Sequence, residues 1–138
     1  MGTIRDIWRV NLKDCIFCNL EQSRVERENN FALSFKDLYP VTEGHSLFIP
    51  KRHVQSFFDL EKNEKEAIFE LLELEREALM EKDNLITGFN IGINDGSDAG
   101  QTVMHCHVHL IPRRKGDVED PRGGVRGVIP EKQKYKRK

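Results

Sequence analysis

The sequence predicts an α+β domain made of antiparallel strands, one long helix and short loops. Apolar residues alternate with polar or small ones from Phe89 to Asn94 and again from Thr102 to Ile111, as in half-buried strands. From Asn63 onward they instead recur every three or four positions, as in an amphipathic helix. Strands and a helix in this order are typical of an α+β domain, in which the helix covers a sheet.

Length and charge favour a single domain. The chain has 138 residues and a formal net charge of -1. We expect a core over about residues 15–113, followed by a C-terminal segment and basic tail, 114–138. The charge gives no support for a nucleic-acid partner, and no apolar run is long enough to cross a membrane. The absence of an apolar leader and the odd number of cysteines, three, predict a reducing, cytoplasmic location.

Two strands are expected before the helix. Residues 31–35 are aromatic and apolar, residues 37–40 form a turn, and residues 46–49 complete an antiparallel pair that Pro50 closes. The first 14 residues and the polar stretch 21–30 are given no element.

The helix is predicted to begin at Asn63, with Glu66 completing its N-terminal cap, and to end at Asp83 and Asn84. Its buried side carries Ala67, Ile68, Leu71, Leu72, Glu75, Ala78 and Leu79. Its opposite, solvated side carries Glu64, Lys65, Glu70, Glu73, Glu77 and Glu81.

Three of the five histidines fall in one stretch, as His105, His107 and His109. On a strand they project to one side, while Met104, Cys106, Val108 and Leu110 project to the other. A row of imidazoles is poorly suited to an apolar interior. We therefore predict that this face meets metal, phosphate or water, rather than forming a structural cluster. Upstream, Cys15 and Cys18 have a spacing that lets two thiolates bind one ion, although a pair of free thiols fits as well.

These motifs resemble the histidine triad (HIT) family, whose signature His-φ-His-φ-His-φ-φ, with φ apolar, matches residues 105–111. The resemblance extends through residues 44–53, 90–96 and 99–102 and covers about residues 15–113. It implies a five-stranded antiparallel sheet with one long helix and a short one. It also implies a homodimer in which the sheet continues across the two copies and the long helix lies at the interface.

The resemblance further implies cleavage at the α-phosphate of a nucleotide through a nucleotidyl-histidine, with His107 as nucleophile. The carbonyl of His105 would hold its tautomer, and His109 would donate to the phosphate. The nucleotide-binding residues implied are Asp37, Asn94, Gly100, Gln101, Thr102 and His109. The loop at Gly100 is expected to turn backbone N–H groups toward the phosphate. Asp37 and Asn94 also suit ordinary turns.

A structural zinc is implied as well, with Cys15, Cys18, His53 and His105 as its ligands. Two sulfurs and two nitrogens form a closed tetrahedral site. His45 is expected near the active-site strands as a supporting hydrogen-bonding group.

Dinucleoside polyphosphates, with adenosine nucleotides foremost, are the expected substrates. Four arginines are expected to neutralise the charge of a long polyphosphate, namely Arg113, Arg114, Arg122 and Arg126. Three other functions use the same histidines or fold: phosphoramidate hydrolysis, a phosphorylase reaction and nucleotide binding for regulation. A role at DNA ends would need the basic tail and has the least support.

Overall fold

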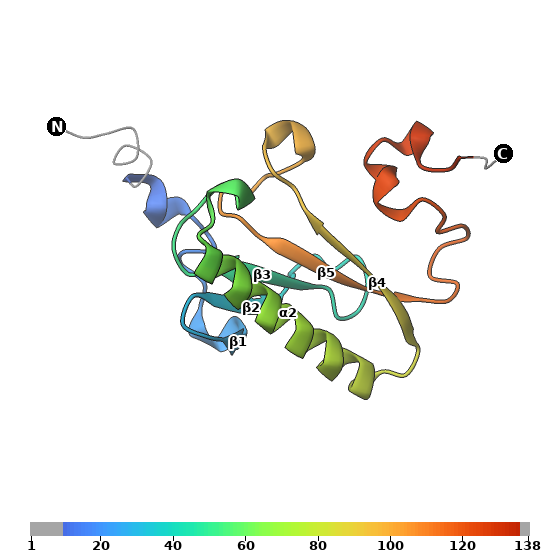
Figure 1. Ribbon diagram of the computed structural model, residues 1–138, viewed down its shortest axis with the longest axis horizontal. Coiled ribbons are helices and arrows are strands. Elements are labelled where there is room, and N and C mark those ends of the chain that lie inside the picture. Colours follow the sequence, from blue (N-terminus) through green and yellow to red (C-terminus); the bar gives the residue numbers. More distant parts are fainter. Residues whose placement is uncertain (1–9, 136–138) are drawn as a thin grey trace.

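The computed structural model describes residues 10–135, so predictions for the first nine residues and for the last three of the basic tail lie outside it. One antiparallel sheet has the order β1-β2-β3-β5-β4. The strands are β1 (Val25–Glu28), β2 (Ala32–Lys36), β3 (Ser46–Pro50), β4 (Ile86–Ile93) and β5 (Val108–Arg114). The helix α2 (Lys62–Lys82) lies across one face of this sheet (Figure 1). The predicted five-stranded α+β fold with one long helix is confirmed.

The shorter α-helix implied by the family has no counterpart within residues 10–135. The other helical segments there are 3-10 turns, namely η1 (Val10–Asp14), η2 (Gln22–Arg24), η3 (Phe57–Asp59), η4 (Ser97–Ala99), η5 (Gly124–Val128) and η6 (Pro130–Lys132). None of the helices in this range combines the length and apolar character that crossing a bilayer requires.

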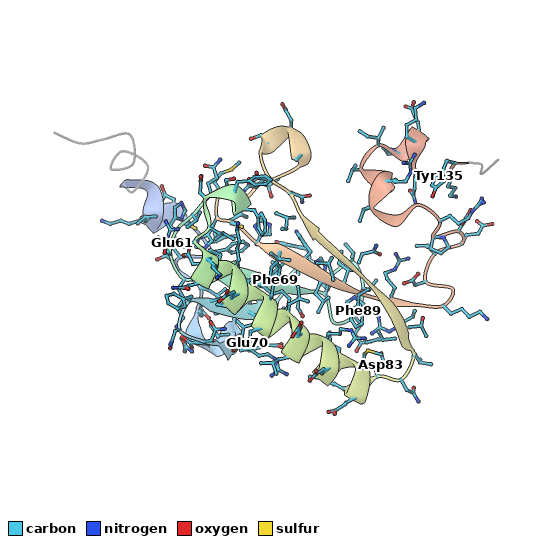
Figure 2. The ribbon with its side chains drawn as sticks, in the orientation of Figure 1. Glu61, Phe69, Glu70, Asp83, Phe89 and Tyr135 are labelled. Carbon is cyan, nitrogen blue, oxygen red and sulfur yellow. The ribbon has the colours of Figure 1, made fainter. Side chains whose placement is uncertain are left out.

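Helix α2 ends at Lys82 as predicted but starts one residue early, and its predicted cap is wrong. The N-cap is Glu61, which forms a capping box with Glu64 and donates its N–H to that carboxylate at 2.8 Å. Glu64 was predicted to be solvated, yet it is only 3% exposed because it also binds the guanidinium of Arg52 at 2.7 Å. Figure 2 marks the two ends of the helix at Glu61 and Asp83.

Strand β1 was not predicted, because its sequence Val-Glu-Arg-Glu lacks strand-forming apolar content. It is an edge strand that pairs with β2, and its polar side chains make ion pairs with neighbouring elements. Arg27 binds Glu75 of α2 at 3.0 Å. Tertiary partners, rather than local pattern, therefore stabilise this strand.

The predicted strand from Thr102 to Ile111 is wrong over its first half, since β5 begins at Val108. His105 and His107 precede the strand, and only His109 lies on it. The backbone N–H of Cys106 donates to the carbonyl of Val54 at 2.6 Å, outside the sheet ladder. An alternating sequence also fits an extended loop, because successive side chains of any extended segment point to opposite sides.

The two faces of the sheet differ. Toward α2, Phe48, Val108 and Leu110 pack with apolar side chains of the helix in the main core. On the other face the strand register aligns Phe35 with Leu47, Leu47 with His109, and His109 with Gly92. The face away from α2 therefore holds His109, with an apolar cluster on one side of it and strand β4 on the other.

Candidate active site

His107 has its tautomer set by the backbone. Its Nδ1 lies 2.8 Å from the carbonyl oxygen of His105, which only accepts, so Nδ1 carries the proton and Nε2 keeps its lone pair. This is the contact expected from the family resemblance. The ring is 7% exposed, and the ring of Phe17 meets it edge-on with centroids 5.1 Å apart. The hydrogen bond at Nδ1 leaves Nε2 as the nitrogen with a free lone pair.

His109 has the opposite tautomer, and a chain of hydrogen bonds sets it. The N–H of Val41 donates to His45 Nδ1 at 3.2 Å, so the proton of His45 is on Nε2. That Nε2 lies 2.9 Å from His109 Nδ1, which must accept. His109 Nε2 therefore carries a proton, and this buried atom has no hydrogen-bond partner among the described residues. It is a preset donor.

Burial keeps these two rings neutral. It lowers the pKa of His109 to about 4, with smaller contributions from His107 and His45. The pKa of His45 is lowered by burial as well, although Asp37 opposes the shift with a carboxylate oxygen 3.5 Å from Nε2. Neutral rings are what the hydrogen-bond chain requires. His45 thus supports His109, as its expected supporting role implies.

Asp37 combines a turn role with a place at the site. One carboxylate oxygen accepts the N–H of Tyr39 at 2.9 Å, an ordinary turn contact. The other faces His45. Asn94 lies beside His109 in the lining of the cavity described below, where its amide makes no hydrogen bond within residues 10–135.

The loop at Gly100 offers fewer N–H groups than expected. Gly100 has φ +95°, and its N–H donates to the Ser97 carbonyl at 3.0 Å, while the N–H of Gln101 donates to the Gly96 carbonyl at 3.1 Å. Neither is free for a phosphate, because this tight turn uses its own amides. The Gln101 side chain is buried and braces the loop through Gly96 and the Gln55 carbonyl. Thr102 is exposed, and its N–H and hydroxyl have no partner in the described chain.

A cavity of about 590 Å³ opens next to His109 on the face of the sheet away from α2. Its floor is formed by β4 and β5, one wall by the loop at His45, and the other wall by the C-terminal segment from Pro121 to Gln133. The sequence set residues 114–138 apart from the core, but it did not indicate that part of this segment encloses a cavity. The role of Phe17 beside His107 was also missed, although an aromatic residue inside C-x2-C was a visible signal.

The four arginines assigned to a polyphosphate already have partners. Arg113 binds Asp117 at 2.8 Å, and Arg114 binds Asp83 at 2.9 Å. Arg122 binds Asp120 at 3.1 Å. Arg126 donates to the carbonyl oxygens of Lys132 and Gln133, and its guanidinium lies over the ring of Tyr135. Their charges are thus engaged in holding the fold.

A second cluster joins Cys15, Cys18, His53 and His105, whose ligand atoms all lie within 4.8 Å of one another. The Cys18 sulfur is 3.1 Å from His53 Nδ1 and 3.5 Å from His105 Nδ1. His105 Nε2 donates to the Pro50 carbonyl at 2.9 Å, so the lone pair on Nδ1 faces the sulfurs. Two sulfurs and two imidazole nitrogens at these separations fit a tetrahedral zinc ion.

Comparison with known proteins places these motifs in a family. The HIT domain family matches residues 21–116. The fusion protein NitFhit of Caenorhabditis elegans is 44% identical over 62% of this chain, but the match covers only 19% of that protein. An asymmetrical bis(5'-nucleosyl)-tetraphosphatase of Schizosaccharomyces pombe is 40% identical over 71% of this chain and 53% of the enzyme.

Among solved structures, a zinc-bound histidine triad family protein from Mycobacterium smegmatis has a TM-score of 0.70 and 33% identity, with 78% of this chain and 81% of that chain covered. The family match spans the strands, the helix and all three triad histidines. Together with the fold and the paired histidine geometry, it shows that this chain belongs to the HIT domain family.

Proposed function

We propose that this protein is a nucleotide hydrolase that cleaves at the α-phosphate through a covalent nucleotidyl-His107. The observation that carries the proposal is the pairing of opposite tautomers. His107 offers a lone pair on Nε2, His109 offers a proton on Nε2, and their ring centroids are 5.2 Å apart. A nucleophile and a preset donor at this separation suit attack on a phosphorus atom and stabilisation of its oxygens.

In the first step His107 Nε2 attacks phosphorus, a P–N bond forms, and the bond to the leaving group breaks with its electron pair on that group. Negative charge grows on the phosphate and leaving-group oxygens, where the His109 proton stabilises it. One comparable donor contributes about 3 kcal/mol in acyl-transfer enzymes, where charge also grows on an oxygen. Water then attacks the same phosphorus, the P–N bond breaks, and His107 is restored. Asn94 and Thr102 supply further donors near the phosphate.

We propose dinucleoside polyphosphates and related adenosine nucleotide conjugates as the substrates. The similarity to a bis(5'-nucleosyl)-tetraphosphatase supports this class. The second candidate is hydrolysis of nucleoside phosphoramidates. The arginine contacts favour it, because three of the four arginines expected to bind a polyphosphate are paired with carboxylates and the fourth, Arg126, donates to backbone carbonyls.

We also propose that the cysteine and histidine cluster holds a structural zinc. When bound, the ion would supply a fixed positive centre that neutralises both thiolates. His105 would then be anchored at Nδ1 by zinc and at Nε2 by Pro50. Since the His105 carbonyl sets the tautomer of His107, the same residue links the metal cluster to the nucleophile.

A homodimer is our third proposal. β4 is an edge of the sheet, so its outer backbone groups are unpaired within residues 10–135. Beside it, Phe69 and Met80 of α2 are 47% and 39% exposed. A second copy that pairs along β4 would cover both features. We also propose a reducing, cytoplasmic compartment, in which the thiolates of Cys15 and Cys18 stay available to zinc.

The test of the function is His107→Asn, assayed with diadenosine tetraphosphate and adenosine 5'-phosphoramidate. We expect kcat to fall by about four orders of magnitude for both substrates. AMP should still bind, since His109 and Asn94 remain, and titration calorimetry measures this. Residual turnover above a few per cent would rule out the covalent mechanism. The ratio of the two wild-type kcat/KM values ranks the two substrate classes.

A further inference from the structure

The cavity beside His109 lies on one side of the triad and the apolar cluster of Phe17, Phe35 and Leu47 on the other. From His109 the cavity follows β5 past Ile111 toward Arg113. A substrate whose phosphorus lies at His107 and His109 therefore has two opposite directions in which to extend. At about 590 Å³, the cavity is of the size that binds small molecules.

The walls of the cavity are apolar and exposed. Val41 is 68% exposed, Val125 63% and Val128 77%. All three line this one cavity, together with Ile111. An apolar ligand that covers such side chains is favoured by roughly 25 cal/mol of binding free energy for each Å² of apolar surface removed from water.

The cavity holds no uncompensated positive charge among the described residues. Its one arginine is Arg113, which makes two hydrogen bonds to Asp117, each 2.8 Å long. A chain of phosphates placed there would lack counter-charges, and Asp117 would repel it. The lining therefore fits an uncharged group better than a polyanion.

The wall at Val125 and Val128 is braced from behind. Arg126 binds the Lys132 carbonyl at 2.7 Å, and Gln133 donates to the Arg122 carbonyl at 3.1 Å. At Gly123 an added Cβ would lie 1.9 Å from the Gln133 carbonyl oxygen, so only glycine permits this close packing. Figure 2 shows Tyr135 at the end of this segment, whose ring stacks on the Arg126 guanidinium. The arginines thus hold the wall in place.

We propose that this cavity is a leaving-group subsite that takes an uncharged, planar aromatic group bonded through oxygen or nitrogen to the α-phosphorus. This proposal rests on the proposed hydrolysis at the α-phosphate, and it favours nucleotide conjugates with an uncharged leaving group, such as phosphoramidates, over dinucleoside polyphosphates. Two observations meet here: the inner end of the cavity is His109, whose protonated Nε2 has no partner, and its outer part is an apolar slot between β4, β5 and the C-terminal wall. The leaving atom would lie at the His109 proton and the ring between Ile111 and Val128.

The test compares the 1-naphthyl and phenyl esters of AMP. Their leaving groups are similarly acidic and differ in apolar area, so the ratio of kcat/KM reports the subsite rather than the chemistry. Wild type should favour the naphthyl ester, and Val128→Ser should lower the naphthyl-to-phenyl ratio by about five- to tenfold. The matched control is Ile129→Ser, which removes a neighbouring exposed side chain that does not line the cavity, and should leave the ratio unchanged.

A binding measurement separates this proposal from the proposed function. In the His107→Asn background, titration calorimetry with the naphthyl ester should show weaker binding, by about the same factor, once Val128→Ser is added. If wild type turns over neither ester while this difference in binding persists, the hydrolase proposal fails, but the cavity is still shown to bind the aromatic group. An unchanged Kd and an unchanged ratio would overturn the subsite. The subsite would also be overturned if Val128→Ser had a lower molar mass than wild type in light scattering, because Val128 would then lie in a contact with a second copy.

Discussion

Single residues at this site owe their chemistry to backbone partners rather than to neighbouring charges. His107 donates from Nδ1 to a backbone carbonyl. His45 accepts a backbone N–H and then donates to His109 Nδ1, so His109 has the opposite tautomer to His107. The family resemblance implied the first contact, and also a supporting role for His45 near the active-site strands. It did not identify His109 as the partner of His45, since 64 positions separate the two residues and only the alignment of β3 with β5 joins them.

The low pKa of His109 predicts a loss of stability in acid. Its folded pKa is about 4, below the unfolded value of 6.5, so the unfolded chain binds more protons between these pH values. The stabilisation from its neutral form is complete above pH 6.5 and declines as the pH falls toward 4. Allowing for solvent access through the cavity, we expect a loss on the order of 1 kcal/mol between pH 7 and pH 5.

Urea unfolding of wild type and His109→Asn at both pH values measures this loss. His45, His107 and Asp37 face the same ring, so the difference between the two proteins isolates His109. The asparagine variant should lose less stability on acidification than wild type. Equal losses would mean that folding leaves the pKa of His109 unchanged.

At the scale of secondary-structure elements, the local sequence pattern predicted the elements that have a clear periodicity. It missed those that are fixed by tertiary contacts. α2 and strands β2, β3 and β4 carry their periodicity in the sequence and were placed within a few residues. β1 has no such pattern and is stabilised by ion pairs such as Arg27 with Glu75. The start of β5 at Val108 was missed because alternation continues through the preceding loop, which pairs with Val54 instead of a strand.

The segment that carries Cys15 and Cys18 is expected to hold a zinc ion that is lost when a ligand is removed. Purified protein should contain one zinc per chain by elemental analysis, and Cys18→Ser should lose most of it. We expect Tm to fall by several degrees, because metal binding contributes to folding. Cys106→Ala is the matched control: its thiol is buried in the core away from the cluster, so zinc content should stay the same even if Tm falls. Full zinc content in Cys18→Ser would exclude this site.

For the whole molecule, the β4 edge and α2 point to the same dimer surface. Phe69, Glu73, Arg76 and Met80 follow one stripe of the helix, at spacings of three and four residues. The guanidinium of Arg76 lies 5.9 Å from the centre of the Phe89 ring, which places this stripe toward β4. Figure 2 marks Phe69 on the helix and Phe89 on the strand. Two copies joined along β4 would bring their stripes together.

Light scattering at micromolar concentration should therefore give the mass of a dimer for wild type and of a monomer for Phe69→Glu. A glutamate there would place like charges opposite each other across the two-fold axis, at a cost greater than the apolar contact it replaces. Leu74→Glu is the matched control, because Leu74 is 43% exposed but lies off the stripe, so this variant should remain dimeric. A monomeric wild type would leave β4 an open edge and remove the homodimer proposal. If both variants dissociate, the interface instead spans the broader outer surface of α2, and β4 is not its centre.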